Sequence, residues 1–356
     1  MEIGSEFWTD RNDIPEYSNE MPSWLKKFGN VVLTTSGRGA LSLLLDQVKP
    51  RVKKALLPSY ICDSVISPFE TAGYELTYYD VDKYLKPIDI ESIKNSNIGI
   101  FLHMGYFGFP TNKILSDTIS SLKSNSVIVI EDVTHTLFSD NDTQIDNDFI
   151  IGSIRKWFGT PSGGFLASDK IMNYELFDAD NEFINLRGSS LHRKFEYIKS
   201  RNKSMKSTYL SGFNRAEKIL DEDIKPYKID HTSEMIIKNF DNKQLQSSRK
   251  RNYEFLLKQL SDVDRTEVIF NNLGSDITPM FFPIYVKRNR DKLRQNLIDK
   301  EIYCPVHWPI PKQLIGRLNS ITKNIYESIL SIPCDQRYQI EDMRRITNEI
   351  CSFVEE

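Results

Sequence analysis

The stretch that decides the fold is residues 99–132, GIFLHMGYFGFPTNKILSDTISSLKSNSVIVIED. Its two apolar runs, GIFLHM (99–104) and SVIVIED (126–132), have the length of β-strands. The segment between them, ILSDTISSLKS (114–124), has the length and polarity of an amphipathic helix. A strand, a helix and a second strand in this order form a parallel pair, because a parallel connection has to cross over the sheet. Both runs are continuously apolar, which favours strands that are buried on both faces.

Further apolar runs extend this pattern on both sides. They are VVLTT (31–35), KALLP (54–58), ELTYYDV (75–81), DFIIGSI (148–154) and GGFLAS (163–168). Segments of helical length, GRGALSLLLDQVK (37–49) and ICDSVISPFETAG (61–73), lie between the first of these runs. The alternation predicts an α/β core with a mainly parallel seven-stranded sheet sandwiched by helices.

The C-terminal half has a different composition. From about residue 181 the chain becomes charged, and SEMIIKNFDNKQLQSSRKRNYEFLLKQL (233–260) predicts one long helix. A helix is also predicted at KLRQNLIDKEI (292–302). Strands are predicted at EVIF (267–270), TPMFFPIYV (278–286) and YCPVHW (303–308). We therefore predict a large domain with an N-terminal arm at residues 1–245 and a small α+β domain at residues 246–356.

The charge and the cysteines narrow the classes of function. The 46 basic and 49 acidic residues give a net charge of −3 and are spread along the chain, which argues against nucleic acid or a membrane as partner. The start, MEIGSEFWTDRNDIPEYSNE, does not resemble a secretory signal, and no run is apolar enough to span a bilayer. The widely spaced Cys62, Cys304, Cys334 and Cys351 are interpreted as buried thiols of a cytoplasmic protein, with no metal site.

The sharpest local signal is GSIRKWFGTPSGGFL (152–166), where Lys156 follows a predicted strand and precedes a glycine-rich loop. A lysine in that place can form an imine with an aldehyde, while Ser153 can donate its hydroxyl to a phosphate. Taken alone, Lys156 fits an ordinary surface lysine better, since most lysines are exposed.

Two further segments supply what pyridoxal 5′-phosphate (PLP) requires. In VIVIEDVTHT (127–136), Asp132 ends a strand, where it can pair with a protonated pyridine nitrogen, and His135 can contact the ring. In TTSGRGALSLLL (34–45), a strand leads through Ser-Gly-Arg-Gly into a helix whose first N–H groups can bind a phosphate. Each segment has a structural alternative, namely a helix-capping aspartate or an ordinary tight turn. It is the conjunction with Lys156 that favours PLP.

The same motifs resemble the DegT/DnrJ/EryC1/StrS family of PLP-dependent sugar aminotransferases over nearly the full length of the chain. The matching stretches are SGRGAL, LPSYICDSVISPFETAGYELTYYDVD, IEDVTH, GSIRKWFGTPSGG and ILSIPCDQRYQIEDMRRI. The resemblance implies the PLP-dependent transferase fold type I.

The resemblance also implies roles for individual residues. Lys156 would be the Schiff-base lysine, Asp132 the partner of the pyridine nitrogen and His135 the residue beside the ring. The phosphate would be bound by Gly37, Arg38, Gly39 and Ser153.

The sequence departs from the family pattern at three points. Ser153 lies three residues before Lys156, whereas many members have a longer interval, which indicates a divergent branch. Near Cys62 the family usually has an aromatic residue over the ring, and here Tyr60 would have to serve. The family also sends an asparagine from the partner subunit to the phosphate. Two segments match its position, GFNR (212–215) and DHTSE (230–234); the second leads into the long helix but has no asparagine, so Asn214 of the first is the candidate.

The function implied by the resemblance is transfer of an amino group from an amino acid, glutamate by analogy, to a keto sugar that is nucleotide-linked, in surface polysaccharide or secondary-metabolite biosynthesis. A homodimer with shared active sites is expected. Candidate cleft residues are Tyr106, Trp157, Arg187, His307 and Trp308. Two alternatives remain: another PLP enzyme of this fold, such as a sugar dehydratase, or a non-catalytic regulator. Dehydratases of the family carry histidine in place of the lysine, so Lys156 argues against the first.

Overall fold

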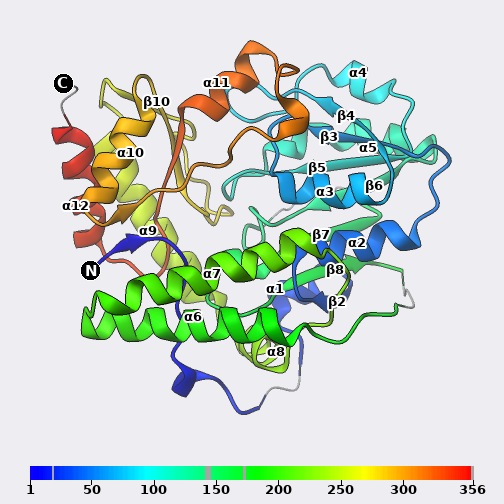
Figure 1. Cartoon of the computed structure of the whole chain (residues 1–356). Coiled ribbons are helices and arrows are strands. Elements are labelled where there is room, and N and C mark those ends of the chain that lie inside the picture. The colour runs from blue at the N-terminus through cyan, green and yellow to red at the C-terminus, as the bar shows by residue number, and fades with distance from the viewer. Residues whose placement is uncertain (18–19, 141–145, 171–173, 354–356) are drawn as a thin grey trace.

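The computed structural model describes residues 1–17, 20–140, 146–170 and 174–353 (Figure 1). Its main sheet has seven strands in the order β2-β8-β7-β6-β5-β3-β4. The strands are β2 (Asn30–Thr34), β3 (Lys54–Pro58), β4 (Glu75–Tyr79), β5 (Ile100–Met104), β6 (Ile128–Asp132), β7 (Phe149–Ser153) and β8 (Gly164–Ser168). Strands β4, β3, β5, β6 and β7 are parallel to one another, and β8 pairs antiparallel with both β7 and β2. The predicted mainly parallel seven-stranded sheet is confirmed.

Helices cover both faces of this sheet (Figure 1). Leu57, Ile100 and Ile130 pack with α2 (Gly37–Gln47) and α3 (Asp63–Thr71) on one face. Their neighbours in the strands, which point the opposite way, pack with α5 (Ser116–Ser124) and α4 (Ile90–Lys94) on the other face. The continuous apolar runs of the sequence are thus explained by burial on two sides.

The charged middle of the chain is helical, as expected. Its helices are α6 (Asn181–Ser200), α7 (Ser204–Glu222), α8 (His231–Lys238) and α9 (Asn242–Leu260). A further short helix, α1 (Ser23–Lys26), precedes the first strand of the sheet. The prediction of one long helix at residues 233–260 is wrong, because the chain breaks between α8 and α9. Asp241 caps α9 through the backbone N–H of Lys243, and the break lets Phe240 stack on Phe158 with ring centroids 3.8 Å apart.

A second sheet is built from the C-terminal part of the chain. It is antiparallel, in the order β12-β10-β9, and consists of β9 (Thr266–Val268), β10 (Phe282–Val286) and β12 (Ile329–Ile332). The helices of this part are α10 (Arg290–Asp299), α11 (Ser320–Ser328) and α12 (Ile340–Ser352). The predicted boundary after residue 245 falls inside α9, which packs against α12.

The N-terminal residues join this second part of the fold. Strand β1 (Ile3–Gly4) pairs in parallel with β11 (Ile302–Tyr303), and the N-terminus lies near α9 and α12 (Figure 1). The predicted strand at residues 303–308 is therefore wrong beyond Tyr303. Pro305 has no N–H to donate to a ladder, which favours an irregular segment there.

The four cysteines are free thiols, but only two are buried as predicted. Burial raises the pKa of both Cys304 and Cys334 to about 12. Cys62 is half-buried and Cys351 is exposed, so the prediction is wrong for these two. No group of metal-ligating side chains is found in the part of the chain that the structure describes, and none of the described helices is long and apolar enough to cross a membrane.

Candidate active site

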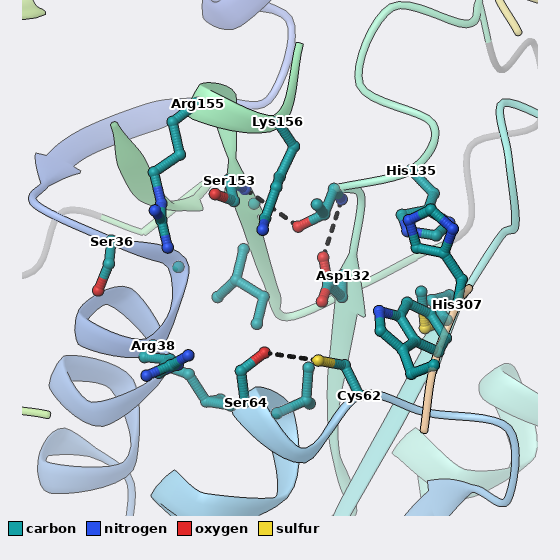
Figure 2. A pocket seen from close by; sticks show the side chains of 18 of the residues that line it. Ser36, Arg38, Cys62, Ser64, Asp132, His135, Ser153, Arg155, Lys156 and His307 are labelled. Atoms are coloured by element: carbon teal, nitrogen blue, oxygen red, sulfur yellow. Dashed lines mark hydrogen bonds between the residues drawn. The ribbon is translucent and has the colours of Figure 1, made fainter. Parts of the chain in front are cut away.

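The carboxyl ends of β6 and β7 bring the predicted chemical groups together. Asp132 is the last residue of β6 and Ser153 the last of β7, and these strands are parallel neighbours. A short 3₁₀ helix, Ile154–Lys156, follows β7 directly. Lys156, Asp132, Ser153 and His135 line one cavity of about 190 Å³ together with the first residues of α2 (Figure 2). Ligands of open α/β sheets bind at this edge, as the sequence analysis expected.

Lys156 reaches into this cavity. Figure 2 shows its amine directed into the space between the start of α2 and Asp132. The side chain is exposed to the space of the cavity, and protein groups surround it there. Desolvation by the protein around the cavity, followed by the charge of Arg155, lowers the pKa of the Lys156 ammonium. The amine is therefore more readily available as a neutral nucleophile or base than a surface lysine.

Asp132 is 5% exposed and faces the cavity. One carboxylate oxygen, Oδ1, accepts a hydrogen bond from the backbone N–H of Thr134 at 2.8 Å. Burial raises the pKa of Asp132, and Thr134 opposes this by donating to the charged form. A carboxylate buried in this way gains from a cation or a protonated nitrogen placed beside it.

His135 is a neutral ring with a defined tautomer. Burial, followed by the charge of Lys156, lowers the pKa of His135 to about 3. The backbone N–H of Phe107 donates to Nδ1 of His135 at 3.2 Å. The proton of the neutral imidazole therefore lies on Nε2, which leaves this atom as a hydrogen-bond donor. The His135 ring packs against Phe107, His307 and Trp308, and the last two also line the cavity.

The start of α2 forms the opposite wall. The backbone N–H groups of Gly37 and Arg38 donate to no described residue, so they are free to bind an anion at the positive end of the helix. The N–H of Gly39 is already bonded to Oγ of Ser36 at 3.0 Å, and Gly39 does not line the cavity. The close approach of the helix to β8 requires glycine at position 164, because a Cβ there would lie 2.1 Å from the carbonyl carbon of Ser36.

Several sequence candidates lie outside this cavity. Tyr60 and Tyr106 are fully buried in an aromatic cluster, and the Tyr106 hydroxyl donates to the carbonyl of Tyr60 at 2.6 Å. Trp157 is buried beneath the site and does not line it. Asn214 lies on the exposed side of α7 and lines neither this cavity nor the one beside it. Its predicted role concerns the partner subunit and stays a prediction.

Four side chains of alternating charge, here called the chain of charges, form consecutive ion pairs that the sequence did not predict. Arg155 forms an ion pair with Glu217 of α7, which also accepts a hydrogen bond from Arg187 of α6 at 2.8 Å. Arg187 in turn contacts Glu6 at 3.2 Å. Only Arg187 was a candidate. These contacts join positions up to 181 residues apart, so no local pattern could reveal them.

The chain of charges borders a second cavity of about 350 Å³. This cavity shares Arg155, Lys156, Met280 and His307 with the first. Cationic side chains outnumber acidic ones in its lining; they are Arg155, Lys156, Arg187, Arg249, Arg294 and Arg337. The acidic residues among the lining are Glu6 and Asp335. Lys156 thus lies at the junction of two compartments, one of which has an excess of positive charge.

No protein-family model and no curated protein sequence matches this chain. Solved structures do. DesI, solved in the presence of its TDP-sugar product, superimposes with a TM-score of 0.66 at 13% identity, over 92% of this chain and 81% of that one. PseC of Helicobacter pylori, an aminotransferase involved in the biosynthesis of pseudoaminic acid, gives 0.63 at 13% identity, over 92% and 88%. A DegT DnrJ EryC1 StrS aminotransferase from Brucella abortus gives 0.61 at 15% identity, over 92% and 88%.

The chain has the fold of these aminotransferases. The predicted fold class is therefore confirmed over nearly the whole chain. At 13–15% identity the likeness concerns the fold, and the chemistry has to be argued from the residues of this chain.

Proposed function

We propose that this chain is a PLP-dependent aminotransferase of the DegT/DnrJ/EryC1/StrS family that works in the cytoplasm. It would move an amino group from an amino acid, glutamate by analogy with the family, to a nucleotide-linked keto sugar. The observation that carries the proposal is the presence of Lys156, Asp132 and the free N–H groups of α2 around one cavity. TDP-sugar binding by DesI, which shares the fold, supports the class of acceptor.

The residues of the cavity fit PLP. The free N–H groups of Gly37 and Arg38, with the Ser153 hydroxyl, match a phosphate, and the buried Asp132 matches a protonated ring nitrogen. His135 Nε2 can donate to an oxygen of the ring. The Lys156 amine can bind the aldehyde covalently. When bound, the cofactor supplies an electron sink for the carbanion that forms at the substrate α-carbon.

The mechanism assigns proton transfer to Lys156. Its Nζ, with a lowered pKa, accepts the proton of the donor's α-carbon, and in the acceptor half-reaction it gives a proton to the sugar carbon that receives the amine. Asp132 would hold a proton on the ring nitrogen of the bound cofactor. The rings of His307 and Trp308 cover part of the cavity and limit the access of water.

The proposal is tested by the fate of Lys156. We expect the purified protein to absorb visible light and borohydride to fix the mass of the cofactor on a peptide that contains Lys156. Lys156→Ala should lose both signals, whereas Lys170→Ala, which alters an exposed lysine outside the cavity, should keep them. Label on Lys123 or Lys170 would refute the assignment. A panel of keto sugars with several amino donors would then identify the substrates.

We also propose that two copies form a homodimer in which each site is completed by the partner. The support is the small number of phosphate donors in one chain. Gly37 and Arg38 offer two N–H groups, while the Arg38 side chain is paired with Asp221 and the Gly39 N–H is occupied. A phosphate dianion in this place needs further donors. The division into domains at residues 1–245 and 246–356 is proposed with it.

A further inference from the structure

The second cavity contains one buried guanidinium whose bonds are incomplete. Arg187 is 2% exposed and lines this cavity. Its Nη1 donates to Glu217 at 2.8 Å and its Nη2 to Glu6 at 3.2 Å. Its Nε is buried and has no hydrogen-bond partner among the described residues. A buried N–H without a partner lowers the stability of the fold, so an acceptor bound at Nε would be stabilising.

Nε, which has no partner among the described residues, and Nη2, which makes one hydrogen bond of 3.2 Å, lie on the same edge of the guanidinium. A carboxylate binds such an edge with both oxygens, in two parallel hydrogen bonds. Glu6 reaches Nη2 with one oxygen only. The edge is therefore a carboxylate site that is half filled by a side chain of the protein itself.

The two carboxylates on Arg187 are held differently. Glu217 is fixed between Arg155 and Arg187 and keeps both guanidinium groups partly neutralised. Glu6 is 38% exposed, and its carboxylate has no ion pair other than that with Arg187 among the described residues. The pair is open to solvent on the Glu6 side only, and Glu6 holds the guanidinium through a single oxygen at 3.2 Å, so a ligand carboxylate can compete for the same edge.

Glu6 can leave without moving the backbone. The carbonyl oxygen of Glu6 accepts hydrogen bonds from Lys194 at 2.5 Å and from Arg337 at 2.9 Å. The preceding strand β1 is paired with β11, and the following Thr9 is bonded to Gly159 at 2.6 Å. The N-terminal segment thus holds the backbone of Glu6 in place, while the carboxylate is partly exposed and makes one ion pair.

We infer that the Nε–Nη2 edge of Arg187 binds a substrate carboxylate and that Glu6 is its resident counter-ion, which the substrate displaces. Naming the occupant as the carboxylate of an amino acid rests on the proposed function, since Lys156 borders the same cavity. The excess of cations around the cavity favours a dicarboxylate. Glu6 would keep Arg187 neutralised between turnovers and would lower the affinity for weaker anions.

The test is a calorimetric titration of the cofactor-loaded protein with succinate, a dicarboxylate that has no amine to react. We expect Glu6→Gln to lower the Kd for succinate roughly five-fold, because the competing side chain loses its charge and holds Arg187 through one hydrogen bond only. The matched control is Glu16→Gln, which removes an exposed carboxylate of the same segment and should leave the Kd unchanged. Arg187→Lys, which keeps the charge but loses the edge, should weaken binding about ten-fold or more.

The comparison of Glu6→Gln with Glu16→Gln decides the outcome even if Arg187→Lys does not fold. An equal Kd in Glu6→Gln and wild type, or an equal gain in both glutamine variants, would overturn the inference. So would the absence of succinate binding in both wild type and Glu6→Gln. Failure of transamination with succinate binding as expected would instead refute the proposed function alone.

Discussion

The indole Nε1–H of Trp157 donates a hydrogen bond to the carbonyl oxygen of Thr134 at 2.7 Å. The bond joins the residue after Lys156 to the turn after Asp132, and Trp157 is fully buried. We expect Trp157→Phe to lower the free energy of unfolding by about 1–2 kcal/mol, because the carbonyl loses its donor in a buried place. Urea unfolding measures this loss, and titration with PLP should show weaker binding as well.

Trp24→Phe is the matched control for this prediction. Trp24 is also buried, and its indole donates to the carbonyl of Phe240 at 3.2 Å, outside the cavity. It should lose similar stability and keep its affinity for PLP. Equal PLP affinities in the two variants would show that the Trp157–Thr134 bond does not position the site.

Asp132→Asn should still bind the cofactor and lose turnover by about a hundred-fold. The amide retains an oxygen for the Thr134 N–H, but it has no charge to keep a proton on the ring nitrogen, so the stabilisation of the carbanion is lost. Glu131→Gln serves as control, because Glu131 points instead to Asn112 and Asn147 and does not line the cavity. Near-normal turnover of Asp132→Asn would assign this role to another group.

Glu217 should stabilise the fold in a pH-dependent way. Burial opposes its ionisation, but the charge and hydrogen bond of Arg155 prevail and hold the pKa of Glu217 far below its ordinary value of 4.5. A carboxyl group with a lowered pKa stabilises the folded state above its unfolded pKa, and this contribution is lost as the pH falls through the folded pKa. The stabilisation is therefore expected at neutral pH and should decline below pH 4.5.

We expect Glu217→Gln to lower the free energy of unfolding at pH 7 by ~2 kcal/mol, less than for a fully buried pair because the side chain is 32% exposed. The difference from wild type should shrink when urea unfolding is repeated at pH 4. Glu234→Gln, which breaks the exposed pair with Lys238, should change stability by less than about 0.5 kcal/mol. A difference for Glu217→Gln that is independent of pH would show that its charge is not the cause.

The proposed homodimer predicts that dilution releases cofactor. A two-fold interface is self-complementary, so both sites form or dissolve together, and occupancy should follow the fraction of dimer. Light scattering across a dilution series gives the mass, and visible absorbance gives the bound cofactor. A monomer with full occupancy and activity at the lowest concentration would refute the shared site and leave the role of Lys156 untouched.

Local patterns predicted the sheet and the residues at its carboxyl edge. Asp132 and Lys156 follow apolar runs directly, so strand periodicity alone places them side by side once the strands pair. Gly39 and Tyr60 were less predictable. The N–H of Gly39 is taken by its own helix cap, and Tyr60 turns into a cluster with residues as distant as Tyr326.

The second cavity could not be predicted either, because its lining residues are also distant from one another in the sequence. Glu6, Arg187 and Glu217 meet only when the N-terminal segment crosses α6 and α7, and none of them stands in a recognisable motif. The break before Asp241 was hidden as well, because an apolar residue at position 240 suits a continuous helix and a stacked turn equally.

The pairing of Ile3 with Ile302 has a consequence for the order of folding. Closing a loop of this length is entropically unfavourable and slow compared with forming the local strand–helix–strand units of the main sheet. During synthesis the first residues leave the ribosome long before their partner strand exists, so they have to wait for it unpaired. Glu6 would then reach Arg187 only after β11 is in place. The ion pair of Glu6 with Arg187 at the second cavity is thus expected to be among the last contacts to form during folding.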